Sequence, residues 1–147
     1  MQTEGTASAM RSLYVALGGF LLGVGAFFTF VVPQVAFSVL GGHGLSVFLG
    51  AVFPRFYLLV SAGGVVLCAL GLLAFRVPSL ASLAPLAALL LTVVAWVWLL
   101  PLVHRAEGTA SFGALHGLSL GLDILAMLLW LAGVAAALIG TQRRPAR

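Results

Sequence analysis

The segment FGALHGLSLGLD, at Phe112–Asp123, lies near the start of a hydrophobic run that continues to Ile139. This run is long enough to cross a lipid bilayer as a helix. It nevertheless holds His116, Ser119 and Asp123, which fall within about 60° of one another on a helix that turns by 100° per residue. An ionisable group at membrane depth costs at least about 2.5–3.5 kcal/mol to insert. This polar edge should therefore face other helices, which the rest of the chain has to supply.

The composition of the chain identifies lipid as its natural solvent. Of the 147 residues, 63% are hydrophobic and only 7% are charged, and the mean hydropathy is +1.23. A soluble domain of this size has too little interior for so much apolar surface. The chain lacks Lys and Asn, which indicates a GC-rich bacterial or archaeal genome. So apolar a chain, with only a short basic tail, excludes a nucleic-acid-binding protein.

The hydrophobic runs predict an all-α, polytopic membrane protein, an antiparallel bundle of four transmembrane helices. The expected helices cover about residues 12–40, 56–75, 83–103 and 111–140, which together form one domain at 12–140. A frayed tail at 1–11 should precede this domain, and a basic tail at 141–147 should follow it. The sequence GGHG, at Gly41–Gly44, predicts a turn, and 45–53 reads as a short interfacial segment between helices 1 and 2 or as the first turns of helix 2.

The arginines predict how the bundle is oriented. With four spans, the side of the two termini carries more arginine than the other side, which carries Arg55 and Arg105. The positive-inside rule therefore predicts an inner membrane protein of a bacterial or archaeal cell with both termini in the cytoplasm.

Two groups of glycines are spaced as in close helix–helix contacts. Such small residues let two helices approach closely in lipid. The predicted helix-packing residues are Gly19 and Gly23 in the first span, and Gly113, Gly117 and Gly121 in the fourth.

The polar residues of the spans gather in the half of the bundle away from the termini. At 1.5 Å per residue, His116 lies about 8 Å and Asp123 about 18 Å below the outer face. Arg55 either anchors at the interface, in an aromatic belt with Phe53, Phe56 and Tyr57, or turns inward to pair with Asp123. The sequence thus predicts an outward-facing polar pocket, or a polar lock between helices, formed by Gln34, Arg55, His104, His116, Ser119 and Asp123.

The chemistry of these residues argues against an enzyme. His116, Ser119 and Asp123 on one helix cannot adopt the geometry of a hydrolase triad, and no GxSxG motif accompanies them. The lone Cys68 and the lack of CxxC and HExxH spacings remove the strong metal signatures. No cofactor is predicted; His116 and His104 are weak metal candidates, and haem b held by His116 with His104 or His43 is the alternative.

Three motifs resemble the transmembrane protein 205-like domain, a four-helix membrane family of unknown function. They are FFTFVVPQVAF (Phe27–Phe37), FPRFY (Phe53–Tyr57) and the segment at Phe112–Asp123. The resemblance implies an Asn where this chain has Asp123, so the acid is expected to be either paired with Arg55 or protonated. The family also looks distantly similar to four-helix copper-resistance and haem-handling membrane proteins, an analogy of fold.

These observations predict a small membrane protein with a non-enzymatic role. It handles a solute or metal through the outward-facing pocket, or it serves as an accessory subunit of a larger membrane complex or homo-oligomer. A haem b-binding redox membrane protein is the alternative. Beyond the lipid bilayer, the expected partners are other membrane proteins and not nucleic acid.

Overall fold

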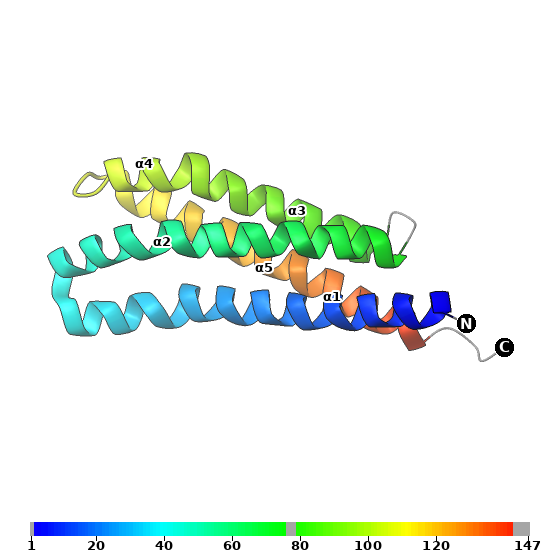
Figure 1. Ribbon diagram of the computed structural model, residues 1–147. Coiled ribbons are helices and arrows are strands. Elements are labelled where there is room, and N and C mark those ends of the chain that lie inside the picture. The colour runs from blue at the N-terminus through cyan, green and yellow to red at the C-terminus, as the bar shows by residue number, and fades with distance from the viewer. Residues whose placement is uncertain (1, 76–78, 143–147) are drawn as a thin grey trace.

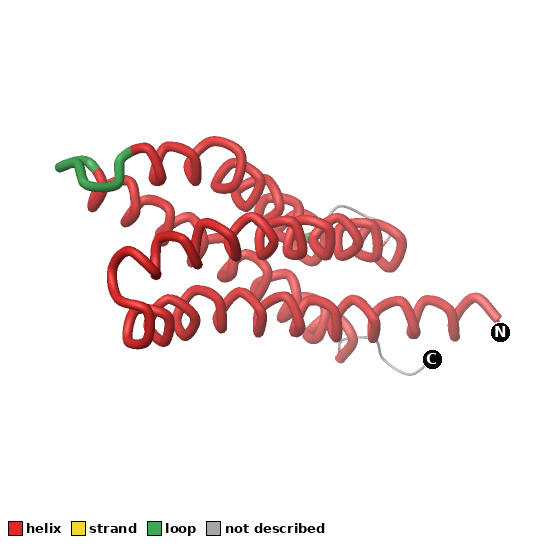
Figure 2. Tube along the Cα trace, turned by 60° about the vertical axis from the view of Figure 1, so that its left-hand side comes forward, coloured by secondary structure: helices red, strands yellow, loops and turns green. Residues whose placement is uncertain are grey.

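Seven helical elements follow one another along the chain. The computed structural model describes residues 2–75 and 79–142, with the side chains of residues 5–40, 44–75 and 79–139. Within these residues the elements are α1 (Gln2–Ala26), η1 (Phe27–Val31), α2 (Val32–Phe75), α3 (Leu80–Val94), η2 (Ala95–Leu99), α4 (Leu100–Arg105) and α5 (Phe112–Gln142). Figure 2 shows that helix makes up nearly the whole trace, with one loop at residues 106–111.

These elements form four helices that are long and apolar enough to cross a membrane. The candidate spans are Gly5–Leu40, Gly44–Phe75, Leu80–Arg105 and Phe112–Ile139. Their large apolar side chains also face outward: Val39 is 74% and Leu72 is 68% exposed. A surface of this kind suits lipid and not water. The predicted all-helical bundle of four spans is therefore confirmed.

The four spans run antiparallel, with the start of α1 and the end of α5 at the same end of the bundle (Figure 1). Although α2 is helical throughout, the chain reverses direction between its two spans, where the sequence predicted a turn at Gly41–Gly44. Of the two predictions for residues 45–53, the structure agrees with the first turns of the second span and not with a separate interfacial segment, since that span begins at Gly44. Pro54 is accommodated inside α2, and the Arg55 guanidinium donates a hydrogen bond to the Ala51 carbonyl beside it.

The predicted frayed tail at residues 1–11 is wrong, because α1 begins at Gln2. The Arg11 guanidinium lies over the Phe75 ring, 5.6 Å from its centroid, which ties the start of the bundle to the end of α2. Cation–π contacts of this kind stabilise by about 0.5–2 kcal/mol. The predicted loop at Arg76–Ser82 lies partly outside the described residues, and α3 begins at Leu80 after the N-cap Ser79.

Two short π-helical turns interrupt the first and third spans. The Val32 amide donates to the Phe27 carbonyl in η1, and the Leu100 amide donates to the Ala95 carbonyl in η2. A proline follows each turn, at Pro33 and Pro101. A proline ring clashes with the carbonyl four residues earlier, so a wider turn at that position relieves the clash. Each π-helical turn is therefore the local adjustment by which its span continues as helix past a proline.

The core of the bundle is built from large side chains set against small residues. Tyr14, Leu21, Tyr57, Leu67 and Trp130 are all at most 1% exposed. Close contacts at glycine bring the helices together, since a Cβ at Gly63 would lie only 2.6 Å from the Leu21 side chain. The Tyr14 hydroxyl donates a hydrogen bond to the Ala81 carbonyl, which joins α1 to α3.

Candidate functional site

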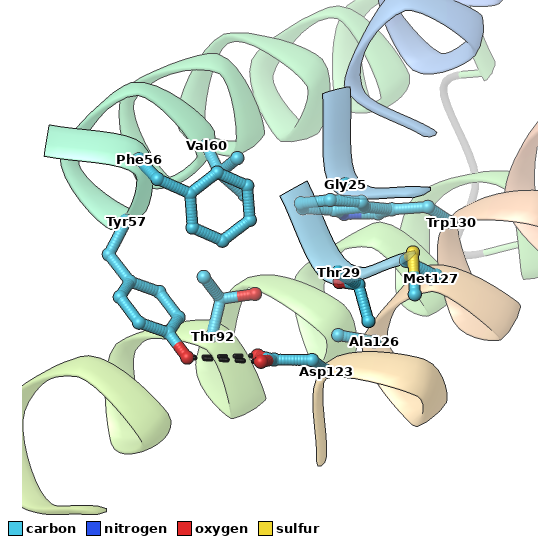
Figure 3. Close-up of a pocket in the computed structure, with 10 residues that line it drawn as sticks. All are labelled: Gly25, Thr29, Phe56, Tyr57, Val60, Thr92, Asp123, Ala126, Met127 and Trp130. Atoms are coloured by element: carbon cyan, nitrogen blue, oxygen red, sulfur yellow. Dashed lines mark hydrogen bonds between the residues drawn. The ribbon is translucent and has the colours of Figure 1, made fainter. Parts of the chain in front are cut away.

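The most unusual polar contact of the bundle joins Asp123 of α5 to Tyr57 of α2. The Tyr57 hydroxyl oxygen lies 3.1 Å from each carboxylate oxygen of Asp123, so both oxygens are within reach of the proton that the hydroxyl donates (Figure 3). Ser119, one turn earlier on α5, also interacts with the Tyr57 hydroxyl. Tyr57 is 1% exposed, so this contact lies inside the bundle.

No cation neutralises this carboxylate among the residues that the structure describes. The interactions of Asp123 are the contact with Tyr57 and burial itself. Of the two alternatives for Arg55, the structure does not form the pairing with Asp123, because Arg55 is exposed and its guanidinium donates to the Ala51 carbonyl of its own helix. Asp123 is therefore a membrane-depth acid whose partner is a neutral hydroxyl.

A small cavity adjoins the carboxylate. Its volume is about 10 Å³, which is about the space that one water molecule needs. Figure 3 shows side chains from α2, α3, η1 and α5 around it. The lining residues are Gly25, Thr29, Phe56, Tyr57, Val60, Thr92, Asp123, Ala126, Met127 and Trp130.

Tyr57 reaches this position because one face of α2 is buried along its length. Phe56 is 6% and Tyr57 is 1% exposed. The Phe56 ring stacks on Phe28 of η1, with centroids 4.8 Å apart and planes 19° from parallel. The sequence interpretation placed both aromatics in an interfacial belt and missed Tyr57 as a site residue. The spacing of Tyr57, Val60, Gly64 and Leu67 along one helical face could have revealed it.

The structure brings together only two of the six residues predicted to form the polar pocket. Ser119 and Asp123 meet at Tyr57. Gln34, Arg55, His104 and His116 are all exposed on the bundle surface. The His116 ring stacks on Phe112 of the same helix, with centroids 5.5 Å apart and planes 12° from parallel. The predicted cluster of six does not form, since the helices are rotated so that these four side chains face outward.

The predicted glycine contacts are also not made among the residues that the structure describes. A Cβ added at Gly19, Gly23, Gly113, Gly117 or Gly121 would meet nothing within 4 Å. The contacts form at neighbouring glycines instead: a Cβ at Gly25 would lie 3.1 Å from the Met127 sulfur. Gly25 lies two residues after the predicted Gly23, which is about 200° around the helix, so the two glycines lie on nearly opposite faces, one packed and one open.

The described residues offer no cluster of three or more His, Cys, Asp or Glu side chains that could hold a metal ion. His104 and His116, the predicted metal candidates, do not line the cavity at Asp123. Cys68 is a free, half-buried thiol in α2, and the side chain of His43 lies outside the described part. The haem alternative thus finds no ligand pair in this cavity and stays a prediction, which the presence of a Soret absorption band would test.

The fold and this site define a class: an all-helical membrane protein of four spans with a half-buried acid between its helices. The family model for "Domain of unknown function (DUF4149)" matches residues 16–111, so the chain belongs to this family. The matched region begins within the first span, includes the second and third spans, and ends just before α5, which carries Asp123. Neither a curated protein nor a solved structure matches the chain. The finer resemblance to the transmembrane protein 205-like domain stays a prediction.

Proposed function

We propose that this protein binds and releases a proton inside the membrane, with Asp123 as the proton-binding group. The observation that carries the proposal is the half-buried Asp123 carboxylate within the fourth span, which has a hydroxyl beside it and no cation among the described residues. The sequence predicted that the protein handles a solute or metal, and here the bound species is proposed to be a proton. No enzymatic step is assigned.

The energetics of a half-buried acid inside a membrane span support this assignment. An unpaired carboxylate taken out of water is strongly destabilised, and such a group normally neutralises itself by taking up a proton. Ionisable residues inside membrane spans mark ion or proton pathways for this reason. Tyr57 suits both states, because its hydroxyl can donate to the carboxylate or accept from the carboxylic acid. Of the titratable groups described, Tyr57 is the one that contacts Asp123; η1 and α3 contribute Thr29 and Thr92.

The size and chemistry of the site disfavour larger or softer ligands. A cavity of about 10 Å³ accommodates nothing much larger than a water molecule. Copper and zinc prefer thiolate and imidazole ligands, whereas this lining offers one carboxylate and hydroxyls. A proton fits both constraints.

The proposal is tested by following the carboxyl C=O stretching band by infrared spectroscopy while the pH of protein in lipid nanodiscs is changed. The chain has three acidic residues, Glu4, Glu107 and Asp123, so the assignment is tractable. A titrating band should disappear in Asp123→Asn and persist in the matched control Glu107→Gln, whose side chain is exposed. The proposal is overturned if the band survives in Asp123→Asn, or if sodium at constant ionic strength displaces the titration.

A second candidate role, as one copy in a homo-oligomer, is favoured by the outer part of α5. We call Gly113, Gly117 and Gly121 the outer seam. All three face open space, and His116 among them is exposed. Ionisable side chains in spans almost always face a bundle interior, and small residues allow close approach of a second helix. A second copy of α5, with the same seam, would cover His116 on both chains.

Disulfide trapping in membranes tests this second candidate. In a Cys68→Ala background, Gly117→Cys should form a covalent dimer under oxidation, because the Cα atoms of a disulfide lie about 4.4–6.8 Å apart. The matched control is Leu72→Cys, which is 68% exposed on α2. Trapping at neither position, or equally at both, contradicts a specific contact through the outer seam.

A further inference from the structure

The cavity beside Asp123 also contains a buried donor that the protein does not satisfy. Trp130 of α5 is 1% exposed, and its ring lines the cavity. Its Nε1–H has no hydrogen-bond partner among the described residues. A buried N–H without a partner is costly, so native structures usually supply an acceptor, often an ordered water molecule.

The arrangement of helices makes room for the indole at this point. A Cβ at Gly64 of α2 would lie 3.7 Å from the Trp130 ring carbon Cζ2, so this glycine lets the ring approach α2. In Figure 3 the ring lies beside Gly25, with Thr29 and Met127 next to it and Asp123 further along the same cavity. The donor and the acid therefore line one small, partly open pocket.

Acceptors for a bridging molecule are present on the other walls. A carboxylate has about four lone-pair sites, and Tyr57 uses only part of this capacity at Asp123. The Thr92 hydroxyl donates its proton to the Ala88 carbonyl at 2.9 Å, which leaves its oxygen able to accept. A water site needs two to four polar partners and about 10–15 Å³ of space, whereas an apolar void of the same size stays dry.

We infer that this cavity is the binding site of a single water molecule, which accepts a hydrogen bond from Trp130 Nε1 and donates one to the Asp123 carboxylate. The inference deepens the proposed function and rests on it only for the role of the water. When Asp123 is protonated, its hydrogen bond with the water reverses, so that the carboxyl O–H donates to the water oxygen. Water binding itself needs only the cavity and its polar walls.

The test uses the indole N–H signals of protein labelled with ¹⁵N-tryptophan in lipid nanodiscs. The chain has three tryptophans, at 96, 98 and 130, and Trp130→Phe assigns the signal of interest by its loss. Cross-relaxation with a long-lived water molecule should appear at the Trp130 N–H. If the assigned Trp130 signal shows none, the inference is wrong.

A cavity-filling variant provides the second readout. Gly25 lines the cavity, and a Cβ there would lie 3.1 Å from the flexible Met127 side chain, so Gly25→Ala should fold and occupy the space. The Trp130 water signal should be lost in Gly25→Ala and kept in the matched control Gly19→Ala, where a Cβ meets nothing within 4 Å. A signal that survives in Gly25→Ala places the water elsewhere and overturns the inference.

The two proposals fail separately. A water signal at Trp130 with no titrating band at Asp123 leaves the water site in place and rejects the proton role. A titrating band at Asp123 with no water signal at Trp130 leaves the proton role in place and rejects the water site.

Discussion

Gly133 of α5 lies at the tightest junction of three helices, which makes it the sharpest test of the packing. A Cβ at this position would lie 2.9 Å from both Cδ and Cγ of Pro85, and 2.9 Å from the Tyr14 hydroxyl. The Pro85 ring cannot rotate away, and Tyr14 is held by its hydrogen bond to Ala81. We therefore predict that Gly133→Ala destabilises the bundle by forcing α1, α3 and α5 apart.

The size of the effect follows from two opposing terms. Overpacking a filled core costs about 1–3 kcal/mol, whereas replacing glycine by alanine inside a helix gains at most about 1 kcal/mol. If the full gain in helix propensity is realised, the net loss is up to about 2 kcal/mol, which corresponds to a fall in Tm of up to roughly 8 °C for a chain of this length, at about 2–4 °C per kcal/mol. Thermal unfolding in a single detergent, followed by near-ultraviolet circular dichroism, measures it.

The matched control is Gly23→Ala in α1, where an added Cβ meets nothing within 4 Å. It makes the same chemical change and the same gain in helix propensity, without the clash, so its Tm should equal or exceed that of the parent protein. Equal Tm values for the two variants would refute the packing described for α5 against Pro85.

Three further predictions test other parts of the structure. Tyr14→Phe leaves the Ala81 carbonyl without its buried donor and should cost about 1–3 kcal/mol in thermal unfolding, so an unchanged Tm would contradict that hydrogen bond. Ser46→Ala removes an exposed hydrogen bond to Glu107 and should change stability by less than about 0.5 kcal/mol, and a larger loss would show that the 106–111 loop matters for folding. Arg55→Gln should leave the infrared titration at Asp123 in place, since Arg55 contacts Ala51; a shifted titration would mean that the arginine influences the acid.

The sequence was sufficient to predict where the helices lie. The fourth span was expected at residues 111–140, and α5 covers Phe112–Gln142. Such agreement follows because a bilayer fixes the minimum length of an apolar helix, and hydropathy records it directly. The earlier start of α1 was missed, because residues 2–11 are too polar for a hydropathy signal and extend the helix beyond the membrane-length run.

The sequence could not predict how each helix is rotated about its axis. In a soluble bundle the polar face marks the outside, but in lipid both faces of a span are apolar. The sequence predicted one bundle-facing edge of His116, Ser119 and Asp123; the structure brings Ser119 and Asp123 to Tyr57 and leaves His116 exposed. Their partner was not predictable in the same way, because choosing Tyr57 over Arg55 requires knowing how α2 is rotated about its axis.

The sequence also could not predict which glycines make the helix–helix contacts. Gly18 and Gly19 are adjacent, and the sequence favoured the second because it completes a four-residue spacing with Gly23. The structure buries Gly18, where a Cβ would overlap the Val134 side chain, and leaves Gly19 open. A spacing rule identifies a helix that can pack closely, but not which of two neighbouring glycines makes the contact.

The two π-helical turns connect the sequence to the site more directly. The segments FFTFVVP at 27–33 and AWVWLLP at 95–101 share an aromatic residue at their second and fourth positions and a proline at the seventh. The aromatic residue at the second position, Phe28 or Trp96, packs against the core. The aromatic residue at the fourth position faces outward, with Phe30 49% and Trp98 73% exposed. A π-helical turn holds one extra residue, which rotates everything beyond it by about 100° relative to an unbroken α-helix. Thr29 lies within η1 and lines the cavity, so the turn that accommodates Pro33 also contributes a residue to the site.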